Sequence, residues 1–492
     1  MKAKLQTIYT ACLPVLAMAI LASCGKGFLD LQPKGKVIVQ ATSDYDLLFN
    51  NGNLIINNVD VGVPMGDEVI AFDNYFSAAT TRSQRLFQWD DVIYDPGVFA
   101  NEMSTLMTSL YVYNKVINEV MNSTGGTDAQ KSALLAEAKA NRAWINFSLI
   151  NLYGKPYNAA TAGTDPGYPI VTTADVTQTV FTRGTVQAMY DFIIKDLTDA
   201  IPDLPVTIRS RIRMGKAAAE ELLGKVYVFM GRYTDAKGQL DAALADLANT
   251  GAGTVLTTMA LYDLNVTMVP GGTWGYNAVT TASSDFNGVP IQANYTENIV
   301  CRAVSINVWT FNSNEYTLSP QAAQLYGSTD RRLNFFTTKP YGVATAYPMT
   351  GALRRNGPSG LQNGMTIPEL YLLRAECEAR LNDSTDAKAD LLVLRTKRMS
   401  STAAPVPTGL TQLQLIQFVL DERIREFALQ GYRWFDMRRL SVDPLFSANT
   451  YTHTLYSPTG ALSATYALRP ERFTLQFPQA VIDQNPGMQN NP

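Results

Sequence analysis

Residues 411–440 read TQLQLIQFVLDERIREFALQGYRWFDMRRL and carry the clearest helical period in the chain. Apolar side chains recur three or four positions apart, on one face of a helix: Leu413, Ile416, Leu420, Ile424 and Phe427. Thr411 and Gln414 match a Thr-x-x-Gln capping box, and Gly431 suits a left-handed stop after Gln430. The stretch therefore predicts a capped helix, a glycine turn and a second short helix that begins at Tyr432.

The same stretch carries an unusual load of charge among its aromatic side chains. The ionised residues are Asp421, Glu422, Arg423, Arg425, Glu426, Arg433, Asp436, Arg438 and Arg439. Asp421 and Arg425 are spaced for a favourable i,i+4 pair, and arginine stems of this kind pack over rings. We interpret the charges as a structural ion network within a packed helix pair, and not as a catalytic cluster.

Two other stretches, 215–245 and 366–394, share a helix–turn–helix pattern. The segment TDAK at 234–237 aligns with TDAK at 385–388, and the same offset pairs Gly231 with Asn382, another residue that tolerates positive φ. Small residues around such a turn are typical of tetratricopeptide-type repeats. Helices near 129–153 and 411–440 would add two more units, so the sequence predicts a mostly α fold with a tetratricopeptide-like helical scaffold.

A large insertion, 250–365, separates these units and has a different composition. It contains no lysine before Lys339, and residues 251–330 hold six charged and nine aromatic side chains among many Gly, Asn, Thr and Ser. This composition predicts an irregular, loop-rich inserted lobe with short strands at most, too aromatic to be disordered. A second irregular segment is expected from Val442 to the end.

The first residues look like a targeting segment. Lys2 and Lys4 precede an apolar run, 11–21, that is too short to span a membrane. The run ends in Leu-Ala-Ser-Cys at 21–24, which matches a bacterial lipobox. We therefore expect a lipoprotein signal peptide over 1–23, acylation of Cys24, an extended tether over 24–40 that docks by Phe28 and Leu29, and a single folded domain over 41–492. The alternative is an ordinary signal peptide that happens to contain a cysteine.

Several of these segments, in this order, resemble the SusD/RagB family. They are Phe-Leu-Asp at 28–30 with Pro33, NRAWINFSLINLYGKPY at 141–157, the two repeat units, DERIREFALQGYRWFDMRRL at 421–440, and the tail FPQAVIDQNPGMQNNP at 477–492. Members are outer-membrane lipoproteins of glycan- and peptide-uptake systems in Bacteroidetes. The resemblance implies a lipid anchor in the outer membrane, exposure to the cell exterior, and a SusC-like TonB-dependent transporter barrel as partner.

Residue types suited to catalysis are scarce. His453 is the one histidine, no serine lies in a Gly-x-Ser-x-Gly elbow, and there is no P-loop or Gly-x-Gly-x-x-Gly. We expect no enzyme activity, no metal, no cofactor and, with 40 basic and 43 acidic residues, no nucleic acid partner. An exported chain could pair Cys301 with Cys377, but buried free thiols fit the pattern better.

The remaining residue types suit the binding of a ligand. Sugars bind flat aromatic platforms flanked by amide and carboxylate groups. On composition and position the ligand-binding candidates are Tyr75, Trp89, Trp274, Tyr276 and Trp309. For each ring, packing within a loop core is the alternative.

The sequence therefore predicts a surface lipoprotein that captures a nutrient, an oligosaccharide or polysaccharide in the first instance, and delivers it to the transporter. Three alternatives stay open: capture of peptides, a tetratricopeptide scaffold lipoprotein for envelope assembly, and a surface hydrolase.

Overall fold

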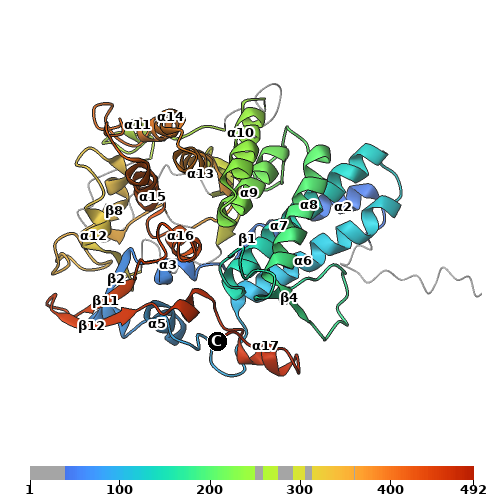
Figure 1. Ribbon diagram of the computed structural model, residues 1–492, viewed down its shortest axis with the longest axis horizontal. Coiled ribbons are helices and arrows are strands. Elements are labelled where there is room, and N and C mark those ends of the chain that lie inside the picture. Colours follow the sequence, from blue (N-terminus) through green and yellow to red (C-terminus); the bar gives the residue numbers. More distant parts are fainter. Residues whose placement is uncertain (1–38, 250–258, 275–291, 305–312, 359–360) are drawn as a thin grey trace, which may run out of the picture.

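A computed structural model describes residues 39–249, 259–274, 292–304, 313–358 and 361–492. Helices dominate it, as the sequence predicts (Figure 1). The longer helices are α2 (Thr42–Leu48), α5 (Thr81–Gln88), α6 (Asn101–Glu119), α7 (Asp128–Tyr153), α8 (Val186–Ala200), α9 (Lys216–Phe229), α10 (Tyr233–Asn249), α13 (Ile367–Arg380), α14 (Ser384–Arg395), α15 (Gln412–Phe427) and α16 (Tyr432–Leu440). Short helices are α3 (Gly62–Met65), α4 (Asp73–Phe76), α11 (Leu264–Thr267), α12 (Pro320–Ala323) and α17 (Gln479–Asp483).

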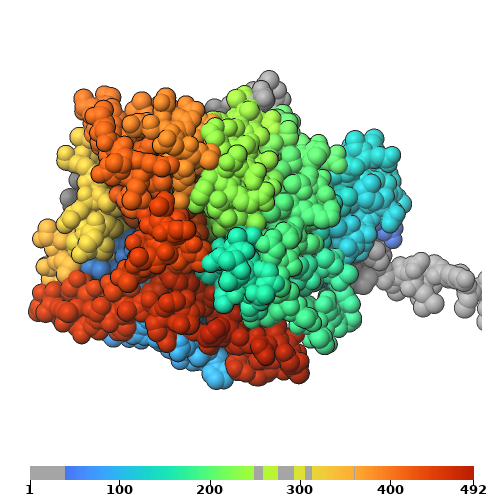
Figure 2. Space-filling view, viewed as in Figure 1, coloured from blue at the N-terminus to red at the C-terminus, as the bar shows by residue number. Residues whose placement is uncertain are grey.

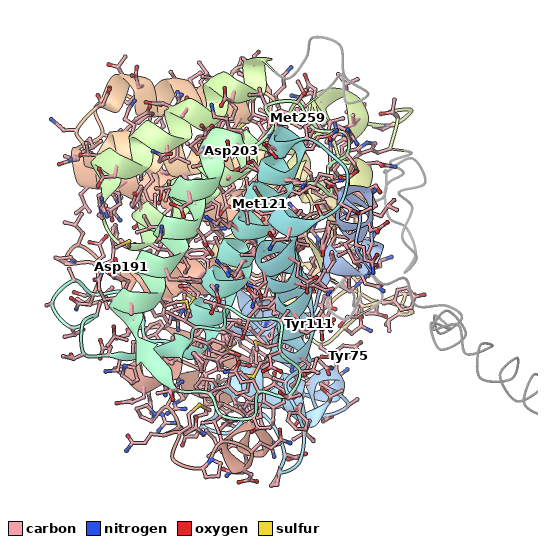
Figure 3. The ribbon with its side chains drawn as sticks, turned by 90° about the vertical axis from the view of Figure 1, so that its right-hand side faces the viewer. Tyr75, Tyr111, Met121, Asp191, Asp203 and Met259 are labelled. Carbon is pink, nitrogen blue, oxygen red and sulfur yellow. The ribbon has the colours of Figure 1, made fainter. Side chains whose placement is uncertain are left out.

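The long helices form one continuous scaffold. Helix α6 packs on α7, α7 on α8 and α9 on α10, and α10 then packs on α13, which also contacts α14 and α15. Figure 3 looks onto the end of this array, where Tyr111 marks α6, Met121 marks the turn that follows it and Asp191 marks α8. Segments far apart in sequence are thereby joined into a single stack of helices, with one large apolar core among α6–α10 and α13 and a second among α13, α14 and α15.

The two predicted repeat units are the helix pairs α9–α10 and α13–α14. Gly231 and Asn382, which the alignment placed at equivalent turns, both have positive φ, 72° and 64°. At the crossing of α9 and α10, a Cβ on Gly224 would lie 2.7 Å from the Leu240 side chain. A small residue is therefore required at this crossing, and the predicted repeat turns are confirmed.

The 411–440 stretch forms α15 and α16 with the predicted capping box: the Gln414 amide N–H donates to Thr411 Oγ1, and the Thr411 amide N–H donates to Gln414 Oε1. Helix α15 ends at Phe427, earlier than predicted, and Gly431 has the expected left-handed backbone with φ 88°. Leu413 is exposed, so the predicted apolar face is wrong at its first position. The core side of α15 instead carries Leu415 and Val419 together with buried charged residues.

The strands are β1 (Ile56–Asn57), β2 (Val69–Phe72), β3 (Pro166–Pro169), β4 (Arg183–Thr185), β5 (Asn298–Val300), β6 (Ala303–Val304), β7 (Thr317–Leu318), β8 (Phe336–Thr337), β9 (Arg354–Arg355), β10 (Met365–Thr366), β11 (Thr452–Tyr456) and β12 (Leu462–Ala467). Four of them form one sheet in the order β12-β11-β2-β7.

This sheet shows that the lobe is not built from the insertion alone. Strand β2 comes from the early part of the chain, β7 from the insertion, and the β11–β12 hairpin from the C-terminal segment, which the sequence suggested was irregular. In the space-filling view the C-terminal residues (red) run along the lower edge against early residues (blue) (Figure 2). Three distant segments therefore meet on the lobe.

Within the described residues no helix is both long enough and apolar enough to cross a bilayer. Cys301 and Cys377 are buried and free, as the sequence analysis favoured.

Candidate functional site

A cluster of aromatic side chains lies on the lobe where β2 passes into α4. We call it the Tyr75 patch and define it as Phe72, Tyr75, Tyr347, Met349 and Tyr456. Phe72 is the buried floor, and the ring of Tyr347 stacks on it with 5.1 Å between ring centroids. Tyr75 meets Tyr347 edge-on at 6.3 Å, and Tyr456, the register partner of Phe72 in the parallel pair β2–β11, lies 6.1 Å from Phe72. Tyr75 and Tyr456 are half-buried, so part of each ring faces solvent.

Backbone contacts fix the rings of the patch in place. The Tyr347 amide donates to the carbonyl oxygen of Thr338 at 2.8 Å, which closes the loop between β8 and β9 beside the sheet. Tyr341 on this loop is 39% exposed and stands over the Arg354 guanidinium, 5.7 Å from the ring centroid. Asn314 holds Tyr341 from both sides, because its Nδ2 donates to the Tyr341 carbonyl and its Oδ1 accepts from the Tyr341 amide.

Polar groups border the same surface. Asn74 is exposed, and the half-buried Asp73 carboxylate accepts a short hydrogen bond from the hydroxyl of Ser463 on β12. Burial raises the pKa of the Tyr347 hydroxyl well above its ordinary value, and the hydroxyl oxygen is itself fully buried, so it is not one of the groups that a ligand on this surface could reach. Preformed rings bordered by an amide, a carboxylate and the Ser463 hydroxyl supply both the apolar and the hydrogen-bonding contacts that a sugar offers.

Trp89 does not belong to this surface. Its ring is 2% exposed, its Nε1–H donates to the Met65 carbonyl at 3.1 Å, and it stacks on His453 with 3.8 Å between centroids. His453 is enclosed on its other side by Phe87, and its two ring nitrogens lie 2.6 Å and 2.7 Å from the carbonyl oxygens of Phe87 and Gly66. Trp89 is therefore a core residue, and the expectation that it offers a platform to a ligand is corrected.

Trp274 is also packed, within a small aromatic cluster of its own. It is 5% exposed, meets Tyr262 edge-on at 4.7 Å and lies parallel to Tyr295 at 6.4 Å. The cavity beside it has a volume of about 90 Å³, whereas pockets for small molecules usually measure ~300–1,000 Å³. No ring face of Trp274 is open among the described residues, so it too is corrected from platform to packing residue.

The remaining candidates lie outside the described residues. Tyr276 and Trp309 fall in 275–291 and 305–312, and Cys24 falls in 1–38. Their assignments stay predictions.

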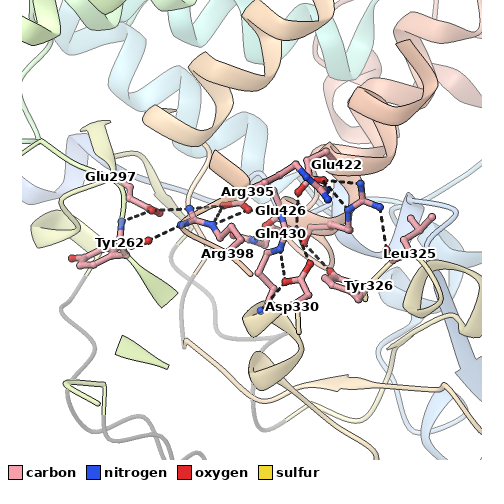
Figure 4. A network of polar contacts seen from close by, with 12 residues as sticks. Tyr262, Glu297, Leu325, Tyr326, Asp330, Arg395, Arg398, Glu422, Glu426 and Gln430 are labelled. Atoms are coloured by element: carbon pink, nitrogen blue, oxygen red, sulfur yellow. Dashed lines mark hydrogen bonds and ion pairs between the residues drawn. The ribbon is translucent and has the colours of Figure 1, made fainter. Parts of the chain in front are cut away.

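The charges of 411–440 form a buried network that ties α15 to the end of α14 and to the insertion (Figure 4). Glu422 accepts hydrogen bonds from Arg332 at 2.7 Å, from Arg425 at 2.6 Å and from Arg395. Glu426 accepts from Arg332 and Arg398, both at 2.8 Å. Arg398 also donates to Glu297 at 2.7 Å and to the Tyr262 carbonyl at 2.8 Å.

Glu422 and Glu426 accept hydrogen bonds from arginines on both carboxylate oxygens. Burial alone would raise the pKa of Glu422, but the guanidiniums of Arg332, Arg425 and Arg395 outweigh it and hold that pKa far below its ordinary value. A carboxylate so firmly ionised and so fully hydrogen-bonded has no proton to give at neutral pH. The arrangement fits the structural network that the sequence analysis favoured, although Arg425 pairs with Glu422 and not, as expected, with Asp421.

In the part of the chain that the structure describes, no group of three or more His, Cys, Asp or Glu side chains could hold a metal ion. The Tyr75 patch is therefore the candidate site. Phe72 and Tyr75 lie in the segment 67–91 that composition favours, whereas Tyr347, Met349 and Tyr456 escaped sequence reasoning. Tyr347, Met349 and the neighbouring Tyr341 lie in PYGVATAYPM at 340–349, where rings between Gly and Pro are the signal that could have found them.

The comparisons with known proteins agree with this architecture. One family model, described as "SusD family", matches residues 365–492, and another, described as "Starch-binding associating with outer membrane", matches residues 27–228. A search of curated proteins found no match.

Solved structures share the fold over nearly the whole chain. A SusD superfamily protein from Bacteroides thetaiotaomicron has a TM-score of 0.69 at 18% identity, with 92% of this chain and 100% of that chain covered. A SusD-like carbohydrate-binding protein from Bacteroides vulgatus has a TM-score of 0.60 at 16% identity, and so has a laminarin-binding SusD-like protein; both comparisons cover 92% of this chain and 99% of the other. The two family matches and this shared fold make the chain a member of the SusD/RagB family.

Proposed function

We propose that this protein captures an oligosaccharide or polysaccharide at the cell surface and delivers it to a TonB-dependent outer-membrane transporter. The observation that carries the proposal is the Tyr75 patch, in which the half-buried rings of Tyr75 and Tyr456 lie over the buried Phe72–Tyr347 stack. Asp73, Asn74 and Ser463 border these rings, on a lobe separate from the helical stack. Similar structures include proteins that bind carbohydrate and laminarin, and this family is one of binding proteins without enzymatic activity.

The patch also separates this proposal from a pure scaffold. A protein that only docks helices has no use for half-exposed rings on a distant lobe. Binding by stacking further requires that the rings be preorganised, and the Phe72–Tyr347 stack and the Asn314–Tyr341 hydrogen bonds supply that order.

The test is binding of starch, laminarin, other glycans and a peptide panel to the mature chain, with Tyr75→Ala beside the matched control Tyr111→Ala. Tyr111 is 38% exposed on α6, far from β2 (Figure 1). We expect at least one glycan to bind and Tyr75→Ala to weaken it about tenfold, or ~1.4 kcal/mol, while Tyr111→Ala leaves it unchanged. Binding of peptides alone, or equal effects of both variants, would contradict the proposal.

We further propose that the protein is held in the outer membrane by lipid on Cys24, facing the exterior. The lipobox at 21–24 and the description of the matched family model support this. Cys24→Ser should leave the precursor uncut or release the protein from membranes, as fractionation would show, and protease treatment of intact cells should cleave the wild-type protein. A Cys24→Ser variant that still fractionates with the outer membrane would exclude the lipid anchor.

A further inference from the structure

A groove of about 810 Å³ lies between the start of α2 and the first turns of α7. In Figure 1, α2 lies on the opposite side of the molecule from β2. Three segments form its walls: the start of α2, the turn into α7 together with the first turns of that helix, and the loop between α8 and α9 that holds residues 205–214. In Figure 3, Met121 and Asp203 mark where two of these segments begin. We call it the tether groove.

The floor of the tether groove is apolar. Leu134, Ile208 and Met214 line it and are nearly fully buried, and Ala133 and Pro205 extend this apolar surface toward the rim. An apolar floor in a groove of this size favours an occupant with large apolar side chains.

The charged groups of the groove are already neutralised. The Arg213 guanidinium donates to both carboxylate oxygens of Glu137, at 2.8 Å and 2.7 Å, and to Asp46 at 2.7 Å, while its face covers the ring of Phe49. Glu137 also accepts from the Met214 amide at 3.0 Å. Because these charged side chains are paired with one another, the groove does not require a strongly charged ligand. Arg209 differs, since its side chain is 84% exposed and contacts Asp46 only at 3.6 Å.

The chain itself enters along the edge of this groove. The Thr124 amide donates to the Gln40 carbonyl and the Thr42 amide to the Thr124 carbonyl, both at 2.9 Å. The Thr42 hydroxyl adds a bond to the Gly125 carbonyl at 2.7 Å. Residues 40–42 are thus pinned at the rim, and the 15 residues that separate Cys24 from Val39 start beside an open apolar groove.

We propose that the tether groove is the docking site of this chain's own tether, with Phe28 and Leu29 on the floor and Asp30 beside Arg209. Phe28 and Leu29 are adjacent large apolar side chains within CGKGFLDLQPKG, with Leu31 two positions further on, and Asp30 is the one acid of this segment. Leu29 precedes Ala41 by 12 residues, which can span up to ~40 Å when extended, so the chain can return across the groove.

Docking would set the distance between the membrane and the folded domain, a consequence that rests on the proposed anchor at Cys24. A free tether of 15 residues reaches up to ~50 Å, whereas the four residues from Cys24 to Phe28 reach at most ~14 Å. The docked state would hold the α2 end of the scaffold near the membrane. Docking itself needs neither glycan nor transporter, so its test is independent of the proposed function.

Crosslinking of paired cysteines tests contact directly. In the mature chain, Leu29→Cys combined with Thr207→Cys on the groove rim should be joined by a short bismaleimide, and Leu29→Cys combined with Leu413→Cys on α15 should not. Thr207 and Leu413 are both exposed, and the native Cys301 and Cys377 are buried. Mass spectrometry of the linked peptides identifies the pair. Equal yields from both variants, or no product with Thr207→Cys, would overturn the proposal.

Proteolysis tests occupancy without new thiols. Ala133→Trp fills the groove and should speed tryptic cleavage after Lys34 and Lys36 at least tenfold, whereas Thr402→Trp on a distant exposed loop should not. Circular dichroism and the melting temperature check that both variants fold. Unchanged cleavage in Ala133→Trp would overturn the proposal, and if that variant instead loses glycan or transporter binding, the groove serves that partner.

Discussion

Glu422 shows at the scale of a single residue why the C-terminal helix carries so much charge. Its carboxylate is the shared acceptor for Arg332, Arg395 and Arg425, and it is fully buried. We predict that Glu422→Gln lowers the free energy of unfolding by about 3–5 kcal/mol, since loss of one partner leaves buried charge uncompensated. Urea unfolding at pH 7 measures this.

The neighbouring Asp421 provides the control for Glu422. It lies on the same helix but near the surface, where its carboxylate accepts a hydrogen bond from Gln417 at 2.7 Å. Asp421→Asn should change the free energy of unfolding by less than about 0.5 kcal/mol. Similar losses in the two variants would mean that the buried network contributes no more than a surface charge.

Glu68 is the reverse case, a buried carboxylate that lacks compensation. Neither of its oxygens has a hydrogen-bond partner among the described residues, and burial, reinforced by the charge of Asp67, raises its pKa to about 8. The folded state therefore holds a proton that the unfolded state, with an ordinary pKa of 4.5, releases. The contribution of Glu68 to stability is present below pH 4.5 and is lost as pH rises toward 8.

We accordingly predict that Glu68→Gln removes the loss of stability that Glu68 causes as the pH rises toward 8. The variant should exceed the wild type in free energy of unfolding by about 1–3 kcal/mol at pH 8.5, the cost of a buried group without partners, and should match it at pH 4.5. Urea unfolding at the two pH values gives the comparison. A constant difference between variant and wild type at both values would show that Glu68 does not titrate between them.

At the scale of elements, the close approach of α3 to the α15–α16 turn decides how the C-terminal helices seat on the rest of the chain. A Cβ on Gly62 would lie 2.3 Å from the carbonyl oxygen of Gly431. We predict that Gly62→Ala lowers the free energy of unfolding by about 1–3 kcal/mol, because backbone must move to relieve the overlap. Gly238→Ala in α10, where no atom lies within 4 Å, should be neutral or stabilising by about 0.5–1 kcal/mol. Thermal unfolding of both variants measures the contrast, and equal effects would refute it.

The same contact shows what the sequence could and could not predict about elements. Local signals were sufficient for the Thr411 cap, for the left-handed Gly431, and for the matched turns at Gly231 and Asn382, because each depends on residues a few positions apart. The need for glycine at position 62 depends on a residue 369 positions away, which no local pattern encodes.

Pairing across long distances also explains the failures at the candidate site. Strands β2 and β7 are only four and two residues long, and they share a sheet with β11 from the far end of the chain. Strands this short show no alternation of apolar and polar side chains from which the sheet could be predicted. Composition could propose aromatic rings but could not tell a packed ring from an open one. Trp89 and Trp274 are buried, and so is Tyr347, while Tyr75 and Tyr456 are half-buried.

At the scale of the whole molecule, binding and docking can use different surfaces. The helical stack and the tether groove lie on one side of the described structure, and the Tyr75 patch lies on the lobe (Figure 1). The proposed capture is of use to the cell only if the glycan passes from this protein to a channel. A stable, functional contact with such a channel should bury more than about 1,600 Å² of surface in total.

We therefore predict that tagged protein, expressed at its native level and extracted in mild detergent, brings down a TonB-dependent barrel of much greater mass. An interface of that size buries enough apolar surface to survive extraction, and its loss at high salt alone would indicate a small, charged contact instead. An unrelated tagged lipoprotein from the same membrane is the control and should recover no barrel. Recovery of this protein alone, with its cognate transporter present in the extract, would argue against delivery by direct docking and would favour a free-standing binding protein.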